Sequence, residues 1–328
     1  MLYSEQMKQI CEHLGVDPGT CSDGLYSTLL QTICDACGSG GGGGGGDIDA
    51  LIDGSITEVS SNAEGVRRYS FYGCDKLTKA DFPLATSIGD SAFQDCSALT
   101  EVNLPLVTSI VPTAFFGCKA LTEVNFPLVT SIERSAFNGC SALTEVNFTL
   151  VTSIGAMAFN KCTALTKADF PLATSIVTTA FSGCSALTEV NFPLVTSIES
   201  QAFSSCTALT EVNFPLVTSI GSSAFNGCSA LTKADFPLAT SIESSAFYGC
   251  TNLTSLVLGG GTVCKLSSTY ALKSTPIESG TGYIYVPAAL VDSYKSATNW
   301  STFAAQFRAL EDYTVDGATT GELDETKI

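Results

Sequence analysis

Apolar residues recur along most of the chain with a fixed period of 22 residues. Each period is a near-copy of the segment AFxGCxALTEVNFPLVTSI, so the same residue types return to the same place in every copy. A short fixed period of this kind is typical of a solenoid, in which successive coils stack and bury a continuous core. The sequence therefore predicts a stack of coils, which presents a long uniform surface rather than one converging catalytic pocket.

The first half of each period predicts a β-strand. In the segment LTEVNL, Leu99, Val102 and Leu104 are expected to point into the core while the polar residues between them stay outside. We expect this strand in every coil, parallel to its neighbours and about 4.8 Å from them, with right-handed crossovers. Pro105 follows the strand, where its missing amide donor ends the ladder with little loss.

The second half of the period carries another apolar set, Leu106, Val107 and Ile110. Its β-branched residues favour a short second strand on the opposite wall of the coil. The chain then turns back, and we expect the phenylalanine of each Ala-Phe pair to point inward and form a buried aromatic column. These phenylalanines are Phe71, Phe93, Phe115, Phe137, Phe159, Phe181, Phe203, Phe225 and Phe247.

A cysteine occupies one further position in nine coils. These cysteines are Cys74, Cys96, Cys118, Cys140, Cys162, Cys184, Cys206, Cys228 and Cys250. An odd number of cysteines at one repeat position cannot pair completely as disulfides. We therefore expect reduced, buried thiols that pack as small apolar side chains.

The repeat, written AFxGCxxLTxVxFPxxTSI, resembles the BspA-like leucine-rich repeat over residues 56–258. The resemblance implies a leucine-rich repeat solenoid of the α/β repeat class, rich in β-structure, with a parallel sheet and 22-residue coils. Proteins with this repeat include surface adhesins and products of phage and prophage genes. The resemblance thus implies a non-catalytic binding or structural module, without family active-site residues to transfer to this chain.

The two ends of the chain depart from the repeat. The predicted parts are an N-terminal helical attachment module (1–37), a poly-Gly linker (38–47), the solenoid (48–258), an α/β C-terminal cap (259–310) and an acidic tail (311–328). The helical hairpin is too small to be stable alone, so it should dock on a partner or self-associate. The cap is needed because the last coil of an open stack exposes an apolar face.

Within the cap, amphipathic patterns predict helices around residues 288–297 and 300–310, with Tyr294, Trp300 and Phe307 in the cap core. The N-terminal segments LYSEQMKQICEHLG and LYSTLLQTICDACG, and the C-terminal stretch beginning YVPAALVDSYKSATNW, are similar to segments of phage and prophage structural proteins of gut bacteria. These include head-fibre-like proteins. This second resemblance implies an anchor, a tether and a displayed repeat region.

Charge excludes some partners. The net charge is −17, from 32 acidic and 15 basic residues, and no basic patch is present to attract a nucleic acid. There is no run of about 18 apolar residues that could insert into a membrane. The first residues, MLYSEQMKQICEHLG, lack the basic leader and apolar stretch of an export signal. We therefore expect a chain made in the bacterial cytoplasm.

Two sets of outward residues are candidates for a binding surface. Glu101, Glu123 and Glu145 occupy one row of the predicted sheet and could form an acidic stripe that takes up cations or a basic partner. The alternative is a solvated sheet face.

The second set lies in the turns, where the coils differ most. Tyr72, Phe116 and Tyr248 precede the repeat cysteines and could be contact points, since aromatic residues dominate binding hot spots. The alternative is that these turns vary because nothing constrains them.

Candidate chemistry is sparse. Cys11, His13, Cys34 and Cys37 are plausible zinc ligands, and a redox role for the CxxC pair is another alternative. Because only one CxxC occurs, and both predicted helices need apolar residues there, we expect helix packing and no metal or cofactor. His13 is the only histidine, so no Ser-His or Cys-His pair can form within the repeats. The sequence predicts that the chain is not an enzyme.

Together these features predict a structural or binding protein, in first place a phage virion appendage, either a fibre or a decoration protein, that displays its repeats for host attachment. Its partners would be a capsid or tail protein at the N-terminal helices and a host-surface protein or glycan at the repeats, with homo-oligomerisation expected. Its location would be the virion. The alternatives are a bacterial cell-surface adhesin and a self-assembling filament subunit.

Overall fold

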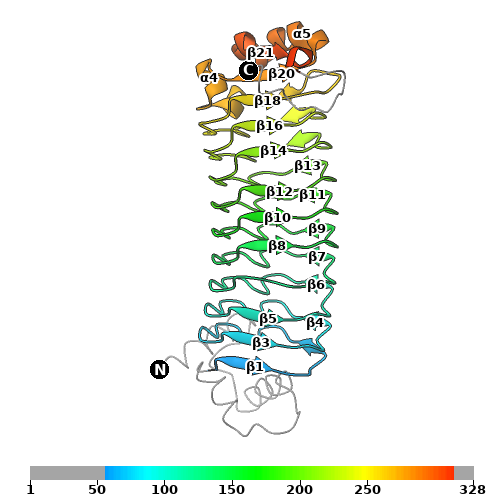
Figure 1. Ribbon diagram of the computed structural model, residues 1–328, viewed down its shortest axis with the longest axis vertical. Helices are drawn as coiled ribbons and strands as arrows, with labels where there is room; N and C mark the ends of the chain where they lie inside the picture. The colour runs from blue at the N-terminus through cyan, green and yellow to red at the C-terminus, as the bar shows by residue number, and fades with distance from the viewer. Residues whose placement is uncertain (1–55, 314–328) are drawn as a thin grey trace, which may run out of the picture. The chain divides into compact units, whose positions relative to one another are not determined.

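The computed structural model describes residues 56–313, apart from the side chain of Asn147 (Figure 1). It divides after Leu143 into two compact units, and each unit is a parallel β-solenoid. The predicted N-terminal helices, the poly-Gly linker and most of the acidic tail lie outside the described residues. So do the candidate ligands Cys11, His13, Cys34 and Cys37.

In the first unit, a coil typically contributes a three-residue strand and then a two-residue strand. The first row of strands contains β1 (Glu58–Ser60), β3 (Lys79–Asp81) and β5 (Glu101–Asn103). The second row contains β2 (Gly65–Val66), β4 (Ser87–Ile88), β6 (Ser109–Ile110) and β7 (Ser131–Ile132). Strands pair in parallel with equivalent residues opposite each other, so Val59, Ala80 and Val102 form one inward column.

The second unit repeats this arrangement and carries its ladder into the C-terminal cap (Figure 1). Its first row contains β8 (Glu145–Asn147), β10 (Lys167–Asp169), β12 (Glu189–Asn191), β14 (Glu211–Asn213), β16 (Lys233–Asp235) and β18 (Ser255–Val257). Its second row contains β9 (Ser153–Ile154), β11 (Ser175–Ile176), β13 (Ser197–Ile198), β15 (Ser219–Ile220), β17 (Ser241–Ile242) and β19 (Lys265–Leu266).

The expectation of a first strand in every coil is wrong for one coil. Residues 122–125 form no strand, and Val124 is half-buried, whereas its equivalent Val102 is buried. These residues read TEVN, like those of coils that do form the strand, so local sequence does not account for the difference.

Both units bury the predicted phenylalanine column. In the first unit the rings of Phe71 and Phe93 stack at 5.1 Å between centroids, and those of Phe93 and Phe115 at 5.5 Å. In the second unit Phe159 and Phe181 stack at 5.2 Å. In most coils a second phenylalanine, which directly follows the first strand, packs against this column, as Phe82 does against Phe71 and Phe170 against Phe159.

The repeat cysteines are buried and unpaired by disulfides, as expected. The structure adds a hydrogen bond that the repeat does not reveal. The thiol of Cys96 donates to the carbonyl oxygen of Phe71 at 2.9 Å, and the thiol of Cys206 donates to that of Phe181 at 3.2 Å. Each thiol therefore contacts the backbone of a neighbouring coil as well as the apolar core.

The second apolar set behaves differently from the expectation. Val107 and Ile110 are buried, but Leu106 is exposed. Its side chain points outward because Pro105 and Leu106 are the corner residues of a turn that the Val107 N–H closes on the Leu104 carbonyl at 3.4 Å. Leu106 therefore does not share the burial of the other two residues in its apolar set.

The cap extends the second unit after β18. It contains η1 (Thr269–Leu272), α4 (Pro276–Ser279), β20 (Tyr283–Val286), η2 (Ala288–Leu290), α5 (Val291–Ser296), η3 (Trp300–Gln306), β21 (Phe307–Ala309) and η4 (Leu310–Tyr313). Strand β20 pairs with β18, and β21 pairs with β20, so the cap continues the parallel ladder. The second predicted cap helix is therefore shorter than expected, because residues 307–309 form a strand.

The predicted cap core is confirmed. Tyr294, Trp300 and Phe307 are buried, with the Tyr294 and Trp300 rings edge to face at 5.6 Å. The polar side-chain atoms of Tyr294 and Trp300 both form hydrogen bonds with the backbone of Cys264. The Cys264 N–H donates to the Tyr294 hydroxyl at 2.9 Å, and the Trp300 indole N–H donates to the Cys264 carbonyl at 2.6 Å.

Candidate functional site

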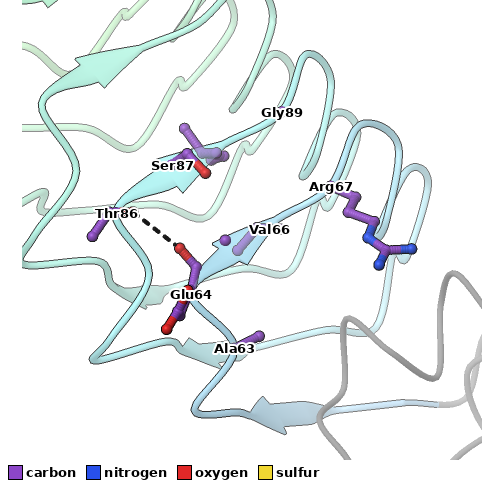
Figure 2. A pocket seen from close by; sticks show the side chains of 9 residues that line it. Ala63, Glu64, Val66, Arg67, Thr86, Ser87 and Gly89 are labelled. Carbon is purple, nitrogen blue, oxygen red and sulfur yellow. Dashed lines mark hydrogen bonds between the residues drawn. The ribbon is translucent and has the colours of Figure 1, made fainter.

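The first unit carries a shallow depression of about 700 Å³, beside the paired strands β2 and β4 (Figure 2). Its charged lining residues are Glu64 and Arg67, and Figure 2 shows the Arg67 side chain extended away from the strands. The Thr86 hydroxyl donates to the Glu64 carbonyl at 3.2 Å, a contact that joins successive coils. This lining lacks the converging acid, base and nucleophile that general acid–base chemistry requires.

Metal and thiol chemistry find little support within residues 56–313. In this part of the chain no three His, Cys, Asp or Glu side chains lie together as a metal site would need. Burial raises the pKa of the Cys184 thiol to about 12, so the thiolate that acts as a nucleophile is not available near neutral pH. None of the helices in the described residues combines the length and apolar character that crossing a membrane would require.

The predicted acidic stripe is not continuous. In the first unit, the Lys79 ammonium lies 2.8 Å from a Glu101 carboxylate oxygen, and this hydrogen bond raises the pKa of Lys79. Glu123 is exposed in the coil that lacks its first strand, so no ladder holds it in line with Glu101.

In the second unit, Glu145 is exposed on β8 and lies in register with Lys167 of β10. The Lys167 ammonium lies 2.9 Å from a carboxylate oxygen of Glu189, which is on β12, the other neighbour of β10. Charges of opposite sign thus alternate over these three coils, but the next coil places Glu211 after Glu189. Solvent screens exposed pairs of this kind, so the pairing between these side chains is weak.

The candidate aromatic residues all lie on the turn edge but differ in exposure. Tyr72 is half-buried, with its ring edge to face against Tyr69 at 5.9 Å, and burial together with Asp95 raises its pKa. Phe116, in the same unit, is also half-buried. Tyr248, in the second unit, is 40% exposed. Each of the three side chains is at least partly exposed.

The turns that carry these residues have a constrained backbone. In each coil the residue before the Ala-Phe pair has a positive φ, including 56° at Thr113 and 57° at Thr179, where a β-branched residue is strained. A second positive φ precedes each repeat cysteine, usually at glycine but at Asp95, Lys161 and Ser205 with φ between 60° and 62°. Hydrogen bonds between coils fix this geometry, as where the Phe115 N–H donates to the Ala136 carbonyl at 2.9 Å.

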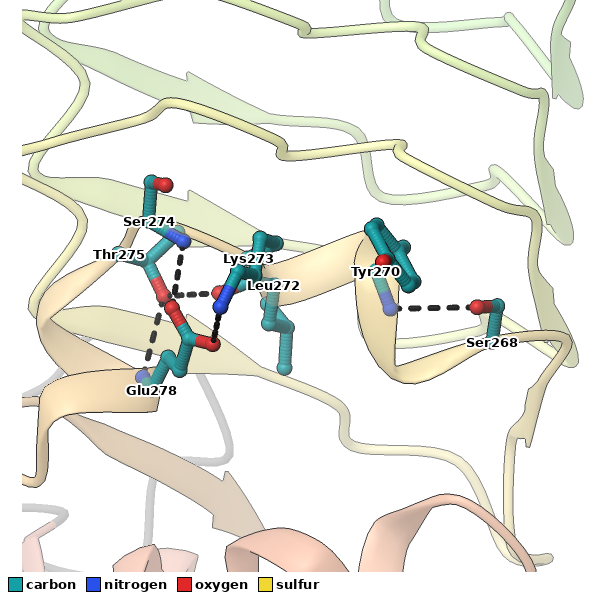
Figure 3. A network of polar contacts seen from close by, with 7 residues as sticks. All are labelled: Ser268, Tyr270, Leu272, Lys273, Ser274, Thr275 and Glu278. Carbon is teal, nitrogen blue, oxygen red and sulfur yellow. Dashed lines mark hydrogen bonds and ion pairs between the residues drawn. The ribbon is translucent and has the colours of Figure 1, made fainter.

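Sequence reasoning missed an exposed site in the cap of the second unit (Figure 3). Tyr270 is 59% exposed, and three residues further along the chain the hydrogen bond to Glu278 raises the pKa of the Lys273 ammonium. The Lys273 ammonium contacts Glu278 at 2.8 Å, and the Ser274 N–H donates to the same carboxylate at 2.7 Å. The 22-residue period fails here, so no column pattern could have predicted this group.

Eight exposed leucines were also missed, because the repeat pattern placed them in the core. In the first unit they are Leu84, Leu106 and Leu128. In the second unit they are Leu150, Leu172, Leu194, Leu216 and Leu238. The turn geometry after the first strand, rather than hydropathy, decides their direction.

Comparison with known proteins identifies the repeat. The profile of the BspA type leucine rich repeat region (6 copies) matches residues 64–188 and 174–283. No curated protein sequence is significantly similar to the chain.

Solved structures similar to this chain include bacterial leucine-rich repeat and surface proteins. A leucine-rich repeat protein of T. pallidum is 25% identical, with 47% of this chain and 78% of that chain covered and a TM-score of 0.43. A leucine-rich cell surface protein of Faecalibacterium prausnitzii is 24% identical, with 76% and 82% covered and a TM-score of 0.40. The pneumococcal vaccine antigen PcpA is 15% identical, with 77% of each chain covered and a TM-score of 0.43.

Proposed function

Because the chain belongs to the BspA-type leucine-rich repeat family, we propose that it is a non-enzymatic attachment protein whose turns present side chains to a partner. One observation carries this proposal. Each coil combines a constant buried interior with variable side chains on turns whose backbone is fixed. The side chains at the first positive-φ position range from Ser91 and Thr113 to Met157 and Gln201, yet φ there stays between 54° and 60°.

A fixed backbone with variable side chains suits binding for a physical reason. A preorganised surface loses little conformational entropy when a partner docks, so more of the contact energy appears as affinity. Loops held by a rigid scaffold are also the usual place for binding residues. The hydrogen bonds that stack one turn on the next, such as Gly227 N–H to Tyr248 carbonyl at 2.8 Å, supply this scaffold.

The absence of a converging catalytic group among the described residues supports binding over catalysis. The repeat thiols are buried, and the depression beside β2 lacks a nucleophile with a neighbouring base. The sheet-face glutamates Glu101 and Glu189 are exposed and paired with lysines of adjacent strands, and neither lies in an enclosed site beside a nucleophile.

At a finer level we propose a phage virion appendage, which the similarity of the two chain ends to phage structural proteins favours. The repeats would contact a protein or glycan of the host surface, and residues 1–37 would bind a capsid or tail protein. The second candidate is a bacterial cell-surface adhesin, which is favoured by the repeat, since proteins with BspA-like repeats include surface adhesins.

Fractionation distinguishes the two candidates. The chain should co-purify with virions after density-gradient separation from cell envelopes, and a variant that lacks residues 1–37 should be lost from the virions while its repeats stay folded. Recovery of the full chain with cell envelopes, accessible to protease on intact cells, would support the adhesin instead. Virion association that survives the deletion would refute the proposed anchor.

A further inference from the structure

An unusual column of apolar side chains lies on the outside of the second unit. We call the leucine stripe the set Leu150, Leu172, Leu194, Leu216 and Leu238, which are 38–47% exposed. Elsewhere in the described part of this unit, the large apolar side chains with comparable exposure are Tyr248 and Tyr270. Contiguous exposed apolar surface on a folded protein marks an interaction site more often than chance placement.

The strands on either side of the turn hold the leucines in line. After the turn, Ile176, Ile198, Ile220 and Ile242 are opposite one another in parallel strands β11, β13, β15 and β17. Before the turn, β10 pairs with β12 and β14 with β16 in the same register. Equivalent leucines are therefore separated by one coil, about 4.8 Å along the stack.

The chemistry of the stripe restricts what can cover it. The turn segments, which read TLVTSI, PLATSI or PLVTSI, contain no ionisable residue in any of the five coils, although the whole chain carries a net charge of −17. An anionic lipid surface attracts proteins through clusters of basic residues, and the stripe has none. The stripe is instead complementary to a partner surface that is also uncharged and apolar and whose side chains repeat at the same spacing.

We propose that the leucine stripe is a self-association surface, covered in solution by the leucine stripe of a second copy of the chain. A second copy presents leucines with the same period, so each leucine of one copy can fill the gap between two of the other along the whole stripe. Two identical stripes in antiparallel orientation satisfy a two-fold axis and give a closed dimer. A partner without this period would match only one or two leucines.

The size and charge of the surface predict how this dimer behaves. A stable interface buries about 800 Å² per partner, and five partly exposed leucines provide only a part of that area, so the flanking threonines and prolines must contribute. Association should therefore be weak and depend on concentration. Because each copy has a net charge of −17, salt should strengthen the dimer by screening the repulsion between copies.

Sedimentation equilibrium of the full chain tests the proposal, at low and high salt and over a wide concentration range. The wild-type protein should approach a dimer at high concentration, more readily in high salt. The triple variant Leu172→Gln, Leu194→Gln, Leu216→Gln should have a dimer dissociation constant at least about tenfold higher. The control variant Tyr248→Gln, Tyr270→Gln removes exposed apolar area outside the stripe and should associate like the wild type.

Thermal unfolding of the same variants checks that the substitutions leave the fold intact, so that the dimer dissociation constants can be compared. The leucines are exposed, so the triple variant should unfold within a few degrees of the wild type. A wild-type chain that stays monomeric at every concentration would overturn the proposal, and this would also be the result if residues 1–55 covered the stripe. Equal dimerisation of the triple variant would overturn it as well, since another surface would then hold the copies together.

Discussion

The amide nitrogen of the Asn191 side chain donates to Asp169 Oδ1 at 2.7 Å, across one step of the coil stack. The same pair recurs in the first unit, where Asn103 donates to Asp81 Oδ1 at 2.7 Å. An aspartate in this column is thus satisfied by an asparagine of the next coil. At Asp235 the next coil offers Val257 instead, and Asp235 Oδ1 has no hydrogen-bond partner although the residue is only 6% exposed.

Replacement of this aspartate by asparagine should stabilise the second unit. A buried polar oxygen without a partner costs about 1–3 kcal/mol, and more when it is charged. The Asp235→Asn variant removes the charge while it keeps the shape, so its free energy of unfolding in urea at pH 7.5 should rise by about 1–3 kcal/mol. Asp169→Asn is the matched control and should change stability little, because Asn191 can still donate to the new amide oxygen. A destabilised Asp235→Asn variant would contradict this account.

The same carboxyl should make stability depend on pH. Burial raises the pKa of Asp235 to about 6 from its usual 3.8, although Lys233 opposes the rise. The folded state therefore binds the proton more tightly than the unfolded state, and this contribution is complete below about pH 4 and is lost as pH rises through about 6.

Urea unfolding between pH 4 and 7.5 measures this contribution. The free energy of unfolding of the wild type should fall by up to about 3 kcal/mol relative to Asp235→Asn across that range, since each pKa unit is worth about 1.4 kcal/mol. A constant difference between the two proteins at all pH values would show that Asp235 does not titrate as described.

A glycine with positive φ offers a test of the turn backbone. Gly183 has φ 77°, and a Cβ there would approach no atom more closely than 3.5 Å, so space is available. The Gly183→Ala variant should still lose about 1–2 kcal/mol, because the left-handed conformation disfavours an L-residue. Gly261→Ala, at a glycine without positive φ and with open space around it, should change the melting temperature little. Equal effects in the two variants would mean that conformation does not limit the turn.

The repeat thiols should resist modification while the protein is folded. Burial raises the pKa of Cys228 to about 12, and its thiol donates to the Phe203 carbonyl at 3.1 Å. Peptide-resolved mass spectrometry after iodoacetamide treatment at pH 8 should find the nine repeat cysteines unmodified in the native protein and modified in urea. Rapid native alkylation of Cys228 would show that the core opens more readily than its packing indicates.

The interior of the coils could be predicted from the sequence, because a strict period fixes which side chains meet. The phenylalanine column, the buried thiols and the cap core of Tyr294 and Trp300 follow from apolar pattern alone. Leu106 was misplaced for a physical reason. Hydropathy argued for burial, but the turn that begins at Pro105 points the next side chain to solvent. The pattern of residue types along the chain does not show in which direction a turn points its side chains.

The outer surface was predicted less well, because it depends on particular pairs of residues in adjacent coils. The Lys79–Glu101 contact follows from the stacking register of the coils. The absence of a strand at residues 122–125, by contrast, is not explained by any feature of the sequence. The orphaned carboxylate of Asp235 arises where the repeat meets the cap and Val257 replaces the expected asparagine. Such end effects require a structure, since they depend on how the cap packs against the last regular coil.

The binding of the full chain to intact cells tests the central claim, attachment through the variable turns, most directly. Flow cytometry with labelled protein would compare the wild type with a variant that carries Phe116→Ser and Tyr248→Ser, and with the control Thr188→Ser on the exposed sheet face. We predict saturable binding to bacterial cells by the wild type and the control, and binding at least about tenfold weaker by the turn variant. Saturable binding to animal epithelial cells alone would favour the adhesin. Absence of saturable binding to either cell type, or equal binding by the turn variant, would contradict the claim.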